Sequence, residues 1–207
     1  MIQFFQKSRN QRGISLVEIM VVLVLVSVIM GAVYYIFNRS NQRMRSQSMI
    51  ADVQTVGAIA FFMIGRDIRR AGSNPAGALG YDVGAPIPFG VAESTRLQIF
   101  ADLNGDGDIL DDDEDIIYEY IDYDSDIAGN DTIRRTAGIN ITYITNVYNF
   151  HINYVLTNGV ITEVPAPVSD VRMVELMFVV GTDQRDPTTN AVVTRAFETT
   201  IGLRNYQ

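Results

Sequence analysis

Acidic and amide side chains with the spacing of a calcium-binding loop lie near the middle of the chain. Asp102, Asn104, Asp106 and Asp108 occupy alternate positions, and a glycine stands at the sixth position of this segment. Alternating oxygen ligands and a glycine at that position let the backbone wrap tightly around a hard cation. The twelfth position, which supplies a carboxylate in such loops, is Asp113. The spacing therefore predicts that these five side chains bind Ca²⁺.

A solvated acidic loop is the alternative interpretation, and the sequence does not decide between the two. The segment 102–115 carries eight carboxylates, and no Lys or Arg lies between Arg96 and Arg134. Such crowded charges repel one another strongly without a counter-charge. Either a bound cation or full solvation at a hairpin tip would relieve this repulsion. Calcium loops prefer a bidentate Glu at the twelfth position, where this chain has Asp113 followed by Glu114.

Residues suited to catalysis are scarce elsewhere. The chain has no Cys and a single His, His151, which lies in an alternating strand pattern. The lack of Cys excludes disulfides, thiol catalysis and Cys-based zinc sites, and the sequence has neither a phosphate-binding glycine loop nor a nucleophile elbow. We therefore expect no enzymatic activity and no cofactor besides Ca²⁺. The formal net charge of −8 argues against nucleic acid as a partner, because phosphate binding needs clustered Lys and Arg.

In the amino-terminal segment, a short basic stretch precedes a long apolar one. Lys7, Arg9 and Arg12 make residues 1–13 a basic leader, and an uncharged, mostly apolar run follows over residues 19–37. About 20 such residues span a bilayer core of ~30 Å. The pattern is typical either of a secretory signal peptide or of a retained membrane helix.

Glu18 lies at the edge of this apolar run. A carboxylate at membrane depth costs about 2.5–3.5 kcal/mol on insertion scales, which makes it a candidate for function. The alternative is that Glu18 lies at the level of the lipid headgroups and is simply solvated.

The segment from Gln11 to Val21, Gln-Arg-Gly-Ile-Ser-Leu-Val-Glu-Ile-Met-Val, resembles the prepilin leader and cleavage motif of type IV pilins and type II secretion pseudopilins. The resemblance implies that a prepilin peptidase cuts between Gly13 and Ile14 and that the new amino terminus on Ile14 is methylated. It also implies that Glu18 pairs with the N-terminal amine of a neighbouring subunit. Such a pair is physically reasonable, because a buried carboxylate is tolerated when an ammonium group meets it.

Two further segments, Arg66–Gly72 and Leu203–Asn205, resemble the PilW-like minor pilins. The resemblance implies a minor pilin that takes part in type IV pilus assembly or priming, with its head at the pilus tip or surface. Its partners would be major and minor pilins, contacted through the N-terminal helix. The chain would first cross the inner membrane once, with its head in the periplasm, and later lie in the pilus at the cell surface.

Two alternative functions stay open at this point. A J-type pseudopilin of type II secretion has the same processing motif, and an exported calcium-dependent adhesion module would use the amino terminus as an ordinary secretion signal. The resemblance at the end of the helix also has a simpler interpretation. Arg66, Asp67 and Arg70 are then a solvated helix face with pairing between successive turns.

A long helix followed by strands must position these residues. Apolar residues recur every three or four positions from Met49 to Ile68, and a stop signal follows at residues 71–75. The sequence therefore predicts an α+β fold, in which a long N-terminal α-helix with a membrane-spanning first half packs on an antiparallel β-sheet head. The predicted divisions are a prepilin leader at 1–13, a transmembrane half at 14–37, an amphipathic half at 38–72, and a β-rich head at 73–207 with an acidic loop at 102–115.

Local patterns predict the strands of this head and the special positions of the helix. Strands are expected at 96–101, 116–121, 148–154, 160–164, 174–180 and 193–203, with a hairpin at Asn158-Gly159 and loops at 73–94 and 181–190. Gly31, Gly57 and Gly65 weaken the helix, so each is expected to mark a bend or a site of close packing.

Overall fold

The computed structural model describes residues 13–74, 88–106, 108–109, 111–124 and 129–204. The predicted leader at 1–13 therefore lies outside the described residues, apart from Gly13. The chain divides into two units between Met44 and Arg45, and each unit is described by itself.

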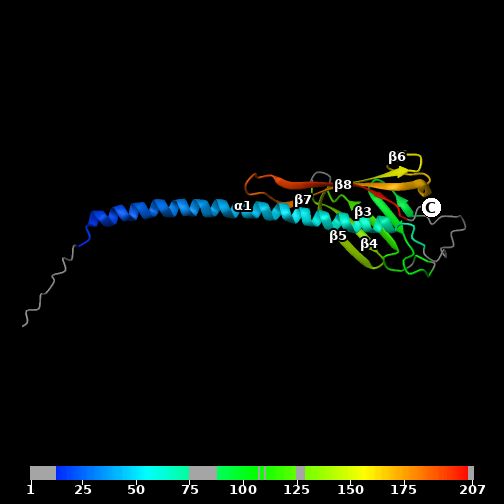
Figure 1. The fold of residues 1–207 in the computed structure, drawn as a ribbon, viewed down its shortest axis with the longest axis horizontal. Helices are drawn as coiled ribbons and strands as arrows, with labels where there is room; N and C mark the ends of the chain where they lie inside the picture. Colours follow the sequence, from blue (N-terminus) through cyan, green and yellow to red (C-terminus); the bar gives the residue numbers. More distant parts are fainter. Residues whose placement is uncertain (1–12, 75–87, 107, 110, 125–128, 205–207) are drawn as a thin grey trace, which may run out of the picture. The chain divides into compact units, whose positions relative to one another are not determined.

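The first unit consists of the first part of helix α1, which runs without interruption from Leu16 to Arg70 (Figure 1). None of residues 13–44 is buried. In the described part of the chain, α1 is the one helix long and apolar enough to cross a membrane. Apolar side chains exposed all round a helix are typical of a segment surrounded by lipid or by other helices.

The end of α1 lies where the sequence predicts it. Gly72 has a φ of 72°, a left-handed conformation that glycine adopts without the steric cost of a side chain. The backbone N–H of Gly72 donates to the carbonyl of Phe100 at 2.8 Å, so the residue that ends the helix also begins the contact with the sheet.

The second unit contains the rest of α1 and an antiparallel sheet with the strand order β1-β2-β3-β4-β5-β7-β8, in which the short β6 pairs with β5. This architecture confirms the predicted α+β fold class. The strands are β1 (Phe89–Ala92), β2 (Arg96–Phe100), β3 (Asp115–Ile121), β4 (Asp131–Ala137), β5 (Asn140–Leu156), β6 (Ile161–Thr162), β7 (Val171–Arg185) and β8 (Val192–Gly202), with a short 3-10 helix η1 at Val168–Asp170.

The long strand β5 curls the sheet because it changes partners along its length. Its first half pairs with β4 up to Val147, and its second half pairs with β7 from Val147 onward. Near the end of β5, the N–H of Ile152 donates to the carbonyl of Ser94 at 2.8 Å. The Tyr154 hydroxyl donates to the carbonyl of Glu93 at 3.0 Å. The turn between β1 and β2 therefore covers the edge of β5 that β4 leaves.

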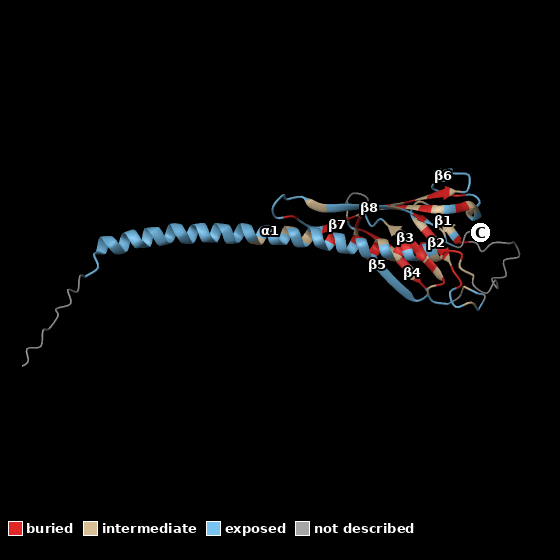
Figure 2. Ribbon diagram, in the orientation of Figure 1, coloured by how far each residue is buried: buried red, intermediate tan, exposed pale blue. Residues whose placement is uncertain are grey.

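The core lies between the second part of α1 and one face of this sheet. Helix residues at steps of three and four are buried, as Figure 2 shows for this stretch of α1: Val53, Gly57, Ala60, Ile64 and Ile68. They pack with strand side chains such as Tyr118, Ile152, Leu176 and Phe178. The buried face of the helix is narrower than the apolar face that the sequence predicts, because Ile50 and Val56 remain 41% exposed.

Four parts of the strand prediction were wrong. Strand β5 begins at Asn140, whereas the predicted strand covers only 148–154. Strand β1 lies inside the segment 73–94 that was predicted as a loop, and β4 was not predicted at all. Strand β7 continues to Arg185, so the predicted loop at 181–190 begins later. In β4, the pair Arg134-Arg135 hides the alternation, although Arg135 points to the buried face.

Gly57 is a site of close packing. A Cβ at this position would lie 2.0 Å from Cε2 of Phe197 in β8. The Phe197 ring is itself stacked on Phe178, with ring centroids 5.3 Å apart. Gly65 differs, because its Cβ would meet only ordinary contacts at 3.6 Å or more. The absence of a side chain at Gly57 therefore lets the helix approach the sheet.

We predict that Gly57→Ala and Gly65→Ala have opposite effects on stability. Alanine adds up to about 1 kcal/mol of helix propensity at both positions, but overpacking at Gly57 costs about 1–3 kcal/mol. Urea unfolding of the full-length protein in detergent measures the difference. Equal stability of the two variants would contradict this packing role of Gly57.

Candidate functional site

The residues of the predicted cleavage site lie directly before α1. Gly13 and Ile14 are outside the helix, and Ile14 is 73% exposed. The N–H of Ile19 donates to the carbonyl of Ser15 at 3.2 Å, which is the first turn of the helix. The bond between Gly13 and Ile14 is thus in exposed, non-helical backbone, as a peptidase requires of its substrate.

Glu18 lies in the first turn of α1 and is exposed. A negative charge in this position interacts favourably with the helix dipole. Its neighbours Val17 and Ile19 are apolar and at least half exposed. Among the described ion pairs, none involves Glu18. In an apolar environment this carboxylate would therefore need a cation from another molecule.

The acidic segment closes the hairpin of β2 and β3. The two strands pair from Arg96↔Glu119 to Phe100↔Asp115. Beyond the last pair, the N–H of Ala101 donates to the carbonyl of Glu114 at 2.9 Å. The N–H of Asp102 donates to the carbonyl of Ser73 at 2.8 Å, which ties the loop to the end of α1.

Three of the five predicted metal ligands, Asp102, Asn104 and Asp106, make hydrogen bonds within the loop. Asp102 is fully buried, and its Oδ1 accepts the N–H of Gly105 at 2.6 Å. The Asn104 side-chain amide donates to Asp106 at 2.9 Å and to Asp111 at 2.6 Å. These contacts fold the loop backbone into a tight turn, in which Gly105 has a φ of 82°.

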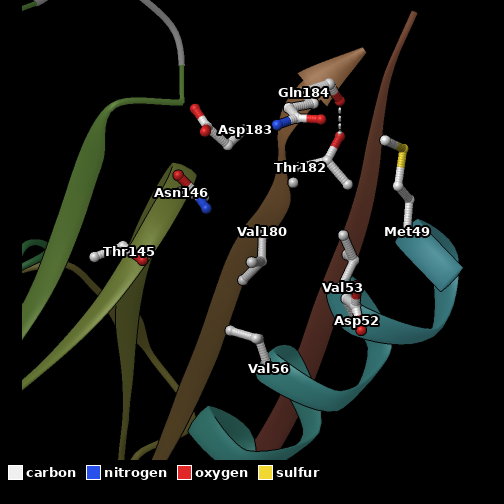
Figure 3. A pocket seen from close by; sticks show the side chains of 11 residues that line it. Met49, Asp52, Val53, Val56, Thr145, Asn146, Val180, Thr182, Asp183 and Gln184 are labelled. Atoms are coloured by element: carbon white, nitrogen blue, oxygen red, sulfur yellow. Dashed lines mark hydrogen bonds between the residues drawn. The ribbon is translucent and has the colours of Figure 1, made fainter. Parts of the chain in front are cut away.

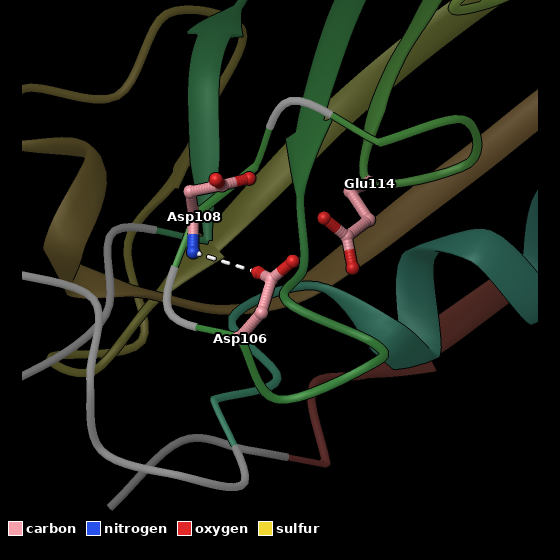
Figure 4. Close-up of side chains that lie close together, drawn as sticks. All are labelled: Asp106, Asp108 and Glu114. Atoms are coloured by element: carbon pink, nitrogen blue, oxygen red, sulfur yellow. Dashed lines mark hydrogen bonds between the residues drawn. The ribbon is translucent and has the colours of Figure 1, made fainter.

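Asp113 is directed at an arginine. Nη2 of Arg135 lies 2.7 Å from Oδ1 of Asp113, and this hydrogen bond lowers the pKa of Asp113 below its ordinary value. Glu114 takes the position near the other ligands instead. Carboxylate oxygens of Asp106, Asp108 and Glu114 all lie within 4.8 Å of one another (Figure 4).

The structure therefore brings together two predicted ligands, Asp106 and Asp108, with Glu114, which was not predicted as one. The signal for Glu114 was present in the sequence, since calcium loops prefer Glu to Asp at the end of the loop.

Comparison with known families decides the identity of the amino-terminal site. Residues 8–34 match the family model described as the prokaryotic N-terminal methylation motif. The chain carries a prepilin-type methylation motif, which indicates a type IV pilin-like protein. Comparison with curated proteins and with solved structures gave no match. The motif implies that this pilin-like protein is processed by a prepilin peptidase and assembles with other pilins. The apolar part of α1 is consistent with membrane anchoring before assembly.

The head of the pilin-like protein contains a buried charge network that the sequence did not reveal. Asp67 of α1 is fully buried. Its Oδ2 accepts the hydroxyl of Tyr118 at 2.8 Å and Nε of Arg135 at 2.9 Å, while Oδ1 accepts Nε of Arg66 at 3.0 Å. The interpretation of Asp67 as part of a solvated helix face was therefore wrong. Arg135 connects this network to Asp113 in the acidic loop.

Burial and the neighbouring charges set the protonation states of this network. Burial and the Asp67 carboxylate raise the pKa of Tyr118 well above its ordinary value, so the phenol remains a donor. Burial by itself lowers the pKa of Arg135. The hydrogen bonds to Asp113 and Asp67 outweigh this effect and raise that pKa above its ordinary value. Arg135 therefore stays cationic.

A cavity of about 320 Å³ lies between α1 and the sheet near Met49. Figure 3 shows Val53 and Val56 on its helix side and Val180 on β7. Asp52, Asn146 and Asp183 also line it. Beyond the cavity, the Ser46 hydroxyl donates to Asp186 at 2.7 Å. Helix and sheet are therefore in tight contact at Gly57 and separated at Met49.

We predict that Asp67→Ala strongly destabilises the head. Without the Asp67 carboxylate, Arg135 and Tyr118 each lose a hydrogen-bond acceptor, and breaking a buried ion pair costs about 3–5 kcal/mol. Arg66→Ala is the matched control, because the Arg66 side chain is 44% exposed and exposed pairs contribute about 0–1 kcal/mol. Urea unfolding followed by circular dichroism measures both variants. A similar loss for the two would contradict the central position of Asp67.

Proposed function

We propose that this pilin-like protein is a PilW-like minor pilin that takes part in type IV pilus assembly or priming, with its head at the pilus tip. The observation that carries the proposal is the methylation motif at residues 8–34, which includes most of the exposed apolar part of α1. The resemblance of Arg66–Gly72 and Leu203–Asn205 to PilW-like chains supports the subgroup. The role is structural and not enzymatic.

In this proposal the peptidase cuts between Gly13 and Ile14, and Glu18 becomes the fifth residue of the mature chain. Before assembly, α1 anchors the protein in the inner membrane with its head in the periplasm. During assembly α1 leaves the lipid and packs against the helices of major and minor pilins. Lipid tails are as apolar as the side chains of these helices, so packing contacts and polar pairs drive this step. The Glu18 carboxylate then meets the amine of a neighbouring subunit, which compensates its burial.

The mature amino terminus tests the processing step. We expect mass spectrometry of the protein from its native host to find a chain that begins with N-methylated Ile14. The same protein made in cells that lack the prepilin peptidase should retain its leader. An intact Met1 in the presence of the peptidase, or a start near Ala32, would overturn the proposal.

Substitution of Glu18 tests the assembly step. We expect Glu18→Val to insert into the membrane and to be processed normally. Its amount in sheared pili should fall more than tenfold. The amine of the neighbouring subunit would lose its carboxylate partner, and an unmatched buried charge costs about 3–5 kcal/mol. Glu18→Asp keeps the charge and should retain part of the incorporation.

Normal incorporation of Glu18→Val would contradict the pairing. If the wild-type protein is absent from pili and its deletion abolishes protein secretion instead, a J-type pseudopilin is the correct assignment.

A further inference from the structure

We propose that the head binds Ca²⁺ through Asp106, Asp108 and Glu114. The pilin assignment says nothing about this site, which lies in the second unit and does not depend on processing or assembly. The proposed ligand set differs from the one that the sequence predicts. It omits Asp113 as a ligand, because that carboxylate is held by Arg135.

The distances suit a calcium ion. Calcium lies about 2.3–2.6 Å from its oxygen ligands, so ligands on opposite sides of the ion are roughly 4.6–5.2 Å apart. The three carboxylate oxygens lie within 4.8 Å of one another. One ion between them would need only small side-chain shifts to contact all three. Asp106 and Asp108 are exposed, so water can complete the coordination from that side.

The buried carboxylate of Glu114 is the second observation that points to a cation. Glu114 is only 2% exposed. Its Oε1 accepts the backbone N–H groups of Leu103 at 2.8 Å and of Asn104 at 3.3 Å. Its Oε2 is buried and has no hydrogen-bond partner among the described residues. A buried acceptor without a donor is costly, especially on a charged group, and a bound cation removes that cost.

The surrounding charges favour a bound cation, and the type of ligand favours a hard one. Three carboxylates this close together repel one another. The sequence supplies no Lys or Arg between Arg96 and Arg134, and Arg135 is already bound to Asp67 and Asp113. All three proposed side-chain ligands are carboxylates, which suit a hard cation such as Ca²⁺ better than a soft metal.

Figure 4 shows the three side chains converging from two sides of the loop. Asp106 and Asp108 come from its first half, and their turn is closed by a hydrogen bond of 3.1 Å between the N–H of Asp108 and Asp106. Glu114 comes from the residue directly before β3. A bound ion would therefore join the two ends of the loop. Ligands that bind only the folded state stabilise it by mass action, so the head should become more stable as Ca²⁺ is added.

Calorimetric titration and thermal unfolding of the full-length protein in detergent test the site, after removal of metal with a chelator. We expect one Ca²⁺ per chain with a dissociation constant of about 10⁻⁴–10⁻³ M, as in other extracellular modules. The melting temperature should rise with Ca²⁺ and rise less with Mg²⁺ at the same concentration. Asp106→Asn and Glu114→Gln should each weaken binding by roughly tenfold or more, because ligand charge sets the affinity.

Asp112→Asn is the matched control. It removes the same charge from the same loop, but Asp112 is not part of the three-carboxylate group. We expect its affinity to stay within about twofold of the wild type. Equal weakening in Asp112→Asn and Asp106→Asn would indicate diffuse attraction by an acidic surface and would overturn the site. An absence of both heat and stabilisation at about 5 mM Ca²⁺ would overturn it as well, and so would equal stabilisation by Mg²⁺.

Discussion

The buried carboxylate of Asp67 is the interaction on which the head depends. A fully buried charge is tolerated only when its partners reach it with good geometry. Tyr118 of β3 and Arg135 of β4 both do so, at 2.8 Å and 2.9 Å. Because these donors come from two different strands, a rotation of α1 or a slip of either strand by one residue would leave the charge uncompensated. The network therefore adds a directional constraint on how α1 lies against the sheet to the apolar contacts between them.

The same arginine links the helix to the acidic loop. Arg135 contacts Asp67 through Nε and Asp113 through Nη2, so a single planar side chain holds two carboxylates from distant parts of the sequence. This pairing orients Asp113 away from Asp106 and Asp108 and leaves Glu114 beside them. The loop is also tied to the end of α1 by the hydrogen bond from Asp102 to Ser73. The shape of the loop thus follows from the helix–sheet junction as much as from its own sequence.

Some of this architecture follows from the sequence and some does not, for physical reasons. Local signals sufficed for the end of α1, where Gly72 adopts a positive φ, and for the second half of β5, where Phe150, Ile152 and Tyr154 alternate with polar residues. The contacts between residues that are distant in the sequence could not be predicted. The two arginines of β4 indicate a solvated segment until Asp67 is known to lie opposite, and the choice between Asp113 and Glu114 depends on Arg135. The narrow buried face of α1 likewise depends on where Phe197 approaches Gly57.

The uniformly exposed apolar surface of the first part of α1 has a consequence for rotation. From Ile19 to Phe37 the chain carries no charge, and the hydroxyl of Ser27 is bound to its own helix, at 2.7 Å from the carbonyl of Val24. In lipid, the energy of such a segment hardly changes when it turns about its axis, because lipid tails are as apolar as its side chains. In lipid the segment is therefore rotationally degenerate, and its angular setting in an assembly must come from packing against neighbouring helices and from polar groups outside the apolar run.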